Sequence, residues 1–317
     1  MLKYLIIQLS DNAPSFCHYP NSNDEHNLIS LENLNAGILF AMKENLNIQF
    51  LYPDDALPQE YKEAIDSIDH VDIVSFQNKD TELLKNANII VINSWEHVTD
   101  QLNKDKNYIL RTSKKEFFEN YNRLIKILPK VERINVILTD IPDFKEDDFE
   151  RYKVILSETS ASLSKDYIDG KTPQTNILTD RMVLKEMNNC NAGDEVITLA
   201  PDGKFYVCPA LYLQNSKAEG DLKEGLKIRN QQLFKLSNSP ICRKCDAYHC
   251  KRCVWLNEKL TLEVNTPGRE QCVISHLERN QSQRLIAKIR EHGTFMPEIE
   301  IKDIDYLDPF EIVNQWK

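Results

Sequence analysis

Glycine is scarce in this sequence. The 317-residue chain holds 8 glycines, whereas a chain with an average glycine content of about 7% would hold roughly 22. Gly37 is the only glycine before Gly170. Dinucleotide-binding turns and phosphate-binding loops need several glycines, because the backbone must approach the phosphates closely. We therefore expect neither kind of nucleotide site in the first 169 residues.

Basic charge and long apolar runs are scarce as well. The 39 Lys and Arg residues are outnumbered by 49 Asp and Glu, which gives a net charge of −10. Nucleic acids and anionic membranes bind basic faces, so we expect neither as a partner. The apolar stretch at residues 4–9 is too short for a signal peptide, and no run approaches the ~18 residues of a membrane span. We expect a cytoplasmic protein, in which clustered cysteines typically serve metal or redox sites.

The first half of the chain alternates between two hydrophobic periods. Residues 114–128 carry an apolar stripe of helical period, and Ser113 with Glu116 forms a capping box at the start of that helix. A second helix is predicted at about 144–163. Alternating strands and helices favour an α/β fold with a mostly parallel sheet, either open or a partial (β/α) barrel. The β-branched runs predict strands at residues 4–9, 48–52, 71–76, 88–93, 108–111 and 134–139.

The composition changes after about residue 175. We predict two consecutive domains, an α/β domain over residues 1–175 and a smaller Cys-rich domain over 176–317. Residues 196–207, VITLAPDGKFYV, predict a hairpin because the Pro-Asp-Gly turn supplies the required backbone angles. A helix at about 274–292 and an acidic tail from Pro297 complete the chain.

Cysteine is concentrated in this second region. Seven of the 8 cysteines lie between residues 190 and 272, and Cys17 stands alone. Seven thiolates exceed the four ligands of one zinc ion, whereas two iron–sulfur clusters take up to about eight. Four cations interleave the thiolates and would offset the negative charge of a cluster: Arg243, Lys244, Lys251 and Arg252. The spacing reads Cys190-x12-Gly203-x4-Cys208, then Cys242-x2-Cys245-x4-Cys250-x2-Cys253, and finally Cys272.

Zinc is the alternative metal. Cys242, Cys245, His249 and Cys253 together would make a chemically sound tetrahedral site. However, only four residues separate the two C-x2-C pairs, which is tighter than the spacing of about 12 to 20 in zinc ribbons. The pattern therefore favours iron–sulfur clusters.

The seven-cysteine pattern resembles the SPASM domain, the auxiliary-cluster module of radical SAM peptide maturases. The central quartet is one residue shorter in each of its last two gaps. Further segments are similar to the CXXX-repeat peptide maturases, and this likeness covers nearly the whole chain. These segments are SFCHY (15–19), MNNCNAG (187–193), CDAYHCKRCVWLN (245–257) and REQCV (269–273).

The resemblance implies two 4Fe–4S clusters and a Cys-repeat precursor peptide as the partner. A separate modifying enzyme or electron donor is a partner in the alternative in which the chain is a docking or electron-transfer subunit. The fourth iron of the first cluster is open, bound by Cys17, or held by another ligand. The resemblance assigns Cys190, Cys208 and Cys253 to this first cluster, and Cys242, Cys245, Cys250 and Cys272 to the second.

The SAM site of the family is missing. Radical SAM enzymes place C-x3-C-x2-C after the first barrel strand, where this chain has SDNAPSFCHYPNS. With Cys17 on the middle position, Ala13 and Pro20 take the outer two. The segment IQFLYPDDALP after the second strand lacks the glycines of the turn that binds the SAM amino group. We therefore expect neither SAM binding nor standard radical chemistry.

Cys17 and His18 allow two interpretations. They form either a buried cysteine beside a surface histidine, or a site in which Cys17 binds the incomplete cluster or acts as a nucleophile. The leading hypothesis for the chain is maturation of a Cys-repeat peptide, with clusters that bind peptide thiolates or transfer electrons. The alternatives are a non-catalytic docking or electron-transfer subunit and a zinc-stabilised interaction module.

Overall fold

The computed structural model describes residues 1–21, 26–184 and 186–299. These residues form two compact units. Unit 1 contains Met1–Ile92 and Cys190–Asn238, and unit 2 contains Asn93–Asn189 together with the chain from Ser239 on. Each unit therefore combines an early and a late segment, unlike the predicted consecutive domains 1–175 and 176–317. The predicted acidic tail falls largely beyond residue 299, outside the described residues.

Unit 1 is built on a six-stranded sheet in the order β4-β3-β2-β1-β8-β9. All neighbouring strands are parallel except β8 and β9, which form the predicted hairpin. The late strand β8 pairs with β1 in a register that sets Tyr4 opposite Val196. The strands are β1 (Tyr4–Gln8), β2 (Asn47–Leu51), β3 (His70–Ser75), β4 (Ile89–Ile92), β8 (Val196–Leu199) and β9 (Phe205–Tyr206).

Close packing explains one glycine of unit 1, and backbone conformation explains another. A Cβ at Gly37 of α1 would lie 2.3 Å from a methyl carbon of Leu199 on β8. Gly203 in the hairpin turn has φ +77°, a left-handed conformation that favours glycine. Ser30 caps α1 by accepting the N–H of Asn33. The helices of unit 1 are α1 (Leu31–Glu44), α2 (Gln59–Asp66), α3 (Thr81–Asn86) and α7 (Pro209–Leu213).

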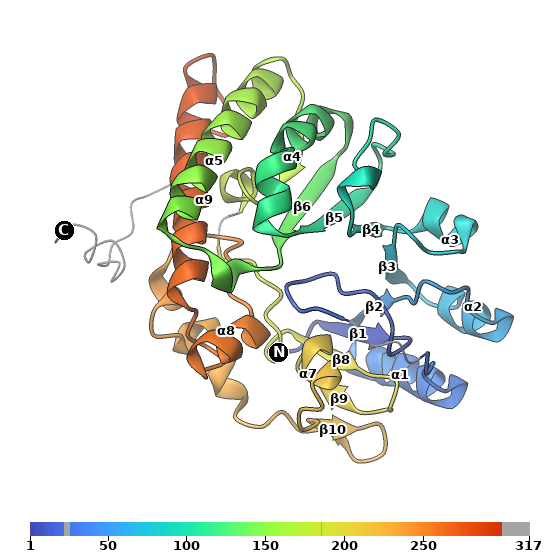
Figure 1. The fold of residues 1–317 in the computed structure, drawn as a ribbon. Coiled ribbons are helices and arrows are strands. Elements are labelled where there is room, and N and C mark those ends of the chain that lie inside the picture. Colours follow the sequence, from blue (N-terminus) through green and yellow to red (C-terminus); the bar gives the residue numbers. More distant parts are fainter. Residues whose placement is uncertain (22–25, 185, 300–317) are drawn as a thin grey trace. The chain divides into compact units, whose positions relative to one another are not determined.

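Unit 2 combines a parallel three-stranded sheet, in the order β7-β6-β5, with long helices. The long helices α5 and α9 lie side by side (Figure 1). The predicted capping box of Ser113 and Glu116 starts α4. The elements are β5 (Asn107–Thr112), α4 (Lys114–Ile127), β6 (Arg133–Leu138), α5 (Glu146–Ile168), β7 (Gln174–Thr175), α6 (Asp180–Val183), α8 (Val254–Thr261) and α9 (Arg269–Arg290).

The predicted α/β class is confirmed, and all six predicted strands are present within about a residue of their expected ends. The last predicted helix begins earlier than expected, at Arg269 rather than at about residue 274, so Cys272 lies inside its first turn. Across the described residues, none of the helices combines the length and apolar character that a membrane crossing requires.

Candidate iron–sulfur sites

Four cysteine side chains line one small cavity in unit 2. They are Cys242, Cys245, Cys250 and Cys272, the four residues that the family resemblance assigns to the second cluster. Cys242 and Cys272 are buried, and the other two are partly exposed. The fold therefore brings together thiols that lie up to 30 positions apart in the sequence.

Hydrogen bonds hold the two chain segments of this cavity against each other. The side chain of Gln271 accepts the N–H of Gly268 at 2.7 Å and donates to the carbonyl of Lys251 at 2.7 Å. The N–H of Lys251 donates to Ser275 Oγ at 3.0 Å. The first turns of α9, which carry Cys272, are thereby attached to the chain between Cys250 and Cys253.

Polar groups already face the sulfur atoms. The backbone N–H of Ala247 donates to Cys245 Sγ at 3.4 Å, and Asn189 Nδ2 donates to Cys250 Sγ at 3.5 Å. The imidazole Nε2 of His276 lies 3.5 Å from Cys245 Sγ. Thiolates that bind a cluster accept such hydrogen bonds, which tune the cluster. The surroundings of these thiols therefore fit a 4Fe–4S cluster.

Electrostatics also favours a bound metal centre. Burial, followed by the charges of the neighbouring Cys242 and Cys245 thiolates, raises the pKa of the Cys250 thiol to about 12. Burial likewise raises the pKa of Cys242, while the charge of Arg252 acts in the opposite direction. Crowded thiols resist joint ionisation unless positive charge compensates them, and a metal centre supplies that charge.

The four cations of this segment are not equivalent. Arg252 is buried and lines the cavity. Lys251 is also buried, and its Nζ forms an ion pair with Glu278 Oε1 at 2.9 Å. Arg243 and Lys244 are exposed. Of the four cations that we expected to offset a cluster, Arg252 is the one that lines the cavity.

The histidine of the zinc alternative lies beside a carboxylate. His249 Nδ1 is 2.7 Å from Asp180 Oδ2, and Asp180 in turn binds Arg133. Within residues 1–21, 26–184 and 186–299, no group of three or more His, Cys, Asp or Glu side chains is placed to hold a single metal ion. A 4Fe–4S cluster spreads its thiolates more widely than one ion does, because each thiolate binds a different iron.

A second set of thiols belongs to unit 1. Burial, together with the thiolate charges of Cys190 and Cys17, raises the pKa of Cys208 to about 12. The three thiols are thus close enough to interact electrostatically, although they come from three distant positions. Cys253, the third ligand that the resemblance assigns to the first cluster, belongs to unit 2, where it is buried and directly precedes α8.

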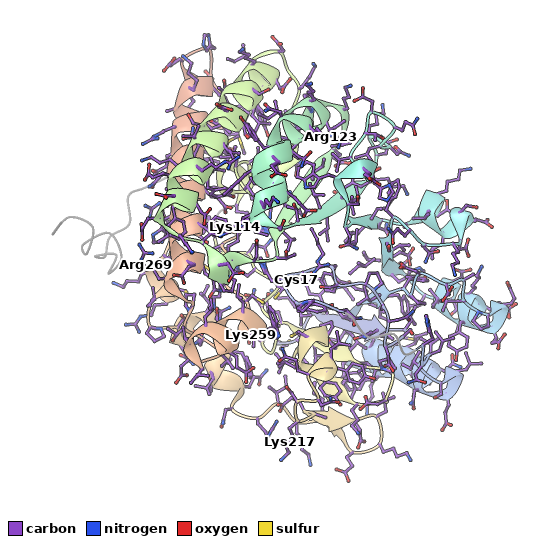
Figure 2. All side chains as sticks on the ribbon, viewed as in Figure 1. Cys17, Lys114, Arg123, Lys217, Lys259 and Arg269 are labelled. Atoms are coloured by element: carbon purple, nitrogen blue, oxygen red, sulfur yellow. The ribbon has the colours of Figure 1, made fainter. Side chains whose placement is uncertain are left out.

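Cys17, labelled in Figure 2, lies in the loop that follows β1. The carboxylate of Asp11 attaches this loop to α7, because it accepts the hydroxyl of Tyr212. Asn27 donates to the same carboxylate at 2.9 Å, and Asn21 donates to its backbone carbonyl at 2.9 Å.

The burial of His18 conflicts with one of the two interpretations of the Cys17–His18 pair. Its side chain is only 6% exposed, whereas Cys17 is partly exposed. The expectation of a surface histidine is therefore wrong, because His18 is buried.

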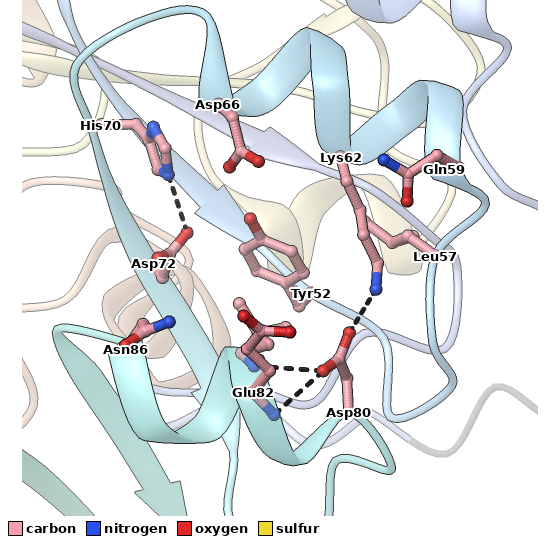
Figure 3. Close-up of a pocket in the computed structure, with 11 residues that line it drawn as sticks. Tyr52, Leu57, Gln59, Lys62, Asp66, His70, Asp72, Asp80, Glu82 and Asn86 are labelled. Atoms are coloured by element: carbon pink, nitrogen blue, oxygen red, sulfur yellow. Dashed lines mark hydrogen bonds and ion pairs between the residues drawn. The ribbon is translucent and has the colours of Figure 1, made fainter.

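Unit 1 holds a further cavity of about 300 Å³ between α2 and α3 (Figure 3). Its walls are largely polar, and two of its carboxylates already have cationic partners. His70 Nε2 lies 3.2 Å from Asp72 Oδ1, and Lys62 Nζ lies 2.5 Å from Asp80 Oδ2. Burial, followed by the charge of Asp72, raises the pKa of Tyr52. No sequence motif indicated this cavity, since its residues come from α2, β3, α3 and the segments next to them.

No protein-family model and no curated protein matches this chain. Among solved structures, it is similar to tagged anSMEcpe with bound AdoMet, with 13% identity and a TM-score of 0.63 over 92% of this chain and 100% of that one. It is also similar to native anSMEcpe with bound AdoMet and the Cp18Cys peptide, with 13% identity and a TM-score of 0.62 over 92% and 100%. At this identity the likeness shows the fold alone, an α/β fold with a parallel sheet like that of a partial (β/α) barrel.

Proposed function

We propose that this chain is an iron–sulfur protein that takes part in the maturation of a ribosomally synthesised Cys-repeat peptide. The observation that carries the proposal is the single cavity lined by Cys242, Cys245, Cys250 and Cys272. The similarity in fold to anSMEcpe, which has been solved with a bound peptide, supports a peptide as the partner. Bound 4Fe–4S clusters would supply one-electron transfer and iron atoms that accept thiolates.

Within unit 1 the first cluster would be bound by Cys190 and Cys208, with Cys17 as its fourth ligand. The electrostatic interaction of Cys17 with Cys208 supports this role. The hydrogen bond from Tyr212 to Asp11 supports it as well, because it attaches the loop of Cys17 to the helix that follows Cys208. A half-exposed Cys17 is accessible to exchange with a peptide thiolate.

A docking or electron-transfer subunit is the second candidate function. Ala13 and Pro20 stand where two of the three SAM-cluster cysteines would be, so the loop after β1 lacks the ligands for that cluster. In this role the protein would present the peptide to a separate modifying enzyme in the cytoplasm, where thiols stay reduced.

Metal analysis tests the proposal directly. The protein purified without oxygen should contain about eight iron and about eight sulfide per chain, the content of two 4Fe–4S clusters. A brown colour and an electron paramagnetic resonance signal after reduction should accompany that content. Protein that holds zinc alone would contradict the proposal.

Incubation of the loaded protein with a reductant, SAM and a Cys-repeat peptide separates the two candidate functions. A change in peptide mass without another protein would identify an enzyme. Tight binding of an unchanged peptide would identify a docking subunit. Formation of 5′-deoxyadenosine would contradict the expected absence of SAM chemistry.

A further inference from the structure

His276 occupies a distinctive position beside the second set of thiols. It is 7% exposed and lies on α9, four residues after Cys272. Residues four apart share one face of a helix, and both side chains line the same cavity. No sequence motif included His276, because the predicted helix began at about residue 274 and left Cys272 outside it.

The imidazole of His276 contacts the sulfur atom of Cys245. Nε2 of His276 lies 3.5 Å from Cys245 Sγ, on a thiol that also accepts the N–H of Ala247 at 3.4 Å. A sulfur with two N–H donors is suited to carry negative charge, because hydrogen bonds to a charged acceptor are stronger than those to a neutral one. The two nitrogen atoms beside Cys245 Sγ come from separate segments, so the contact with His276 also links Cys245 to α9.

Hydrogen bonds to cluster sulfurs have a known physical effect. They stabilise the reduced cluster more than the oxidised one, because the reduced cluster carries one more negative charge on its sulfur atoms. Each such bond therefore raises the reduction potential. Burial of the donor in a cavity with few competing waters strengthens the effect.

We propose that His276 donates its Nε2–H to Cys245 Sγ and thereby raises the reduction potential of the cluster held by Cys242, Cys245, Cys250 and Cys272. The inference rests on the proposed function, since it needs that cluster. His276 is a positioning residue in this role and not a ligand of iron. The second cluster would then accept electrons more readily than it would without this histidine.

The test compares His276→Leu with His276→Gln, whose amide keeps an N–H donor. His292→Leu is the matched control, because His292 is exposed and lies beyond the end of α9. Each variant is loaded anaerobically and titrated with reductant while its electron paramagnetic resonance signal is recorded. The signal that Cys272→Ala lacks identifies the second cluster.

His276→Leu should keep the iron content of the wild type. At a fixed solution potential, the ratio of reduced to oxidised second cluster should fall about tenfold in this variant. For one electron, that change corresponds to a reduction potential lower by about 59 mV. His276→Gln should stay within about twofold of the wild type, and His292→Leu should be unchanged.

Three results would overturn the inference. An unchanged potential in His276→Leu at full iron content would leave the proposed function intact but remove the role of the histidine. Loss of about four irons in both His276 variants would identify a ligand rather than a hydrogen-bond donor. A wild type without iron would refute the proposed function itself.

Discussion

At the scale of single residues, the thiols of Cys208 and Cys250 have strongly raised pKa values. Cys208 and Cys250 both have a pKa of about 12, and desolvation is the largest cause for each. Both thiols also lie near other cysteines, whose thiolate charges act in the same direction. Such thiols are poor nucleophiles when protonated, but they are suited to a metal centre that displaces the protons.

The first prediction concerns Cys17. We expect Cys17→Ala to weaken the first cluster, because that cluster would lose its fourth thiolate, and to leave the second cluster unchanged. Iron released by a mild chelator and the electron paramagnetic resonance signal of each cluster measure the effect. Pro20→Ala in the same loop is the matched control, because Pro20 is exposed. A first cluster as stable in Cys17→Ala as in the wild type would show that Cys17 is not a ligand.

The second prediction concerns removal of metal. In the metal-free protein Cys208 and Cys250 are protonated, and their folded pKa of about 12 exceeds the ordinary value of 9.0. Their contribution to stability is complete below about pH 9 and is lost as the pH rises towards 12. The free energy of unfolding should therefore fall by up to about 1.4 kcal/mol per pH unit for each thiol.

Urea denaturation at several pH values above 8 measures this dependence. The cluster-loaded protein is the comparison. Its cysteines are already deprotonated, so its free energy of unfolding should not fall in this way as the pH rises. Parallel pH curves for the loaded and metal-free protein would contradict the prediction.

At the scale of elements, the first turns of α9 connect the sulfur cavity to the helical layer of unit 2. Cys272, Ser275 and His276 all line the cavity from this helix. Two residues further on, Glu278 accepts the hydroxyl of Tyr152 on α5 at 2.6 Å and pairs with Lys251. Cluster assembly and the packing of α9 on α5 should therefore depend on each other.

The third prediction tests this coupling. Cys272→Ala should lose about four of the expected eight irons and much of its thermal stability, since binding a metal centre supplies folding free energy in such domains. Iron analysis and thermal unfolding measure the two effects. Cys17→Ala is the comparison, because it acts on unit 1 and should leave the second cluster in place. Full iron content in Cys272→Ala would contradict the assignment.

At the scale of the whole molecule, each compact unit is assembled from two distant chain segments. In unit 1 the hairpin of β8 and β9 extends the sheet beyond β1. Leu5 and Ile7 of β1 are fully buried, and Leu199 of β8 packs on Gly37 of α1. The late hairpin is thus part of the hydrophobic core around the first strand.

The fourth prediction follows from that arrangement. A fragment of residues 1–175 lacks β8 and β9, so its first strand would become an exposed apolar edge prone to aggregation. We expect the fragment to aggregate or to unfold without a cooperative transition, whereas the full chain unfolds cooperatively. Circular dichroism during heating distinguishes them. A cooperative transition in the fragment would support a boundary at residue 175.

Much of the local structure could be predicted. The strands, the capping box of Ser113 and the hairpin around Gly203 depend on residues a few positions apart, so their signals are present in any short window. The buried environment of His18 depends on contacts of the whole loop and gave no local signal. The pairing of His249 with Asp180 joins residues 69 positions apart and was equally hidden.

The sequence by itself determined the spacing of the cysteines, the alternation of strands and helices, and the absence of a C-x3-C-x2-C motif after the first strand. These are properties of residue order and short-range periodicity. Only the tertiary structure decided that β8 pairs with β1, that four thiols share one cavity, and that His276 meets Cys245. Such contacts arise when distant segments pack to bury apolar surface, and that packing depends on the whole chain at once.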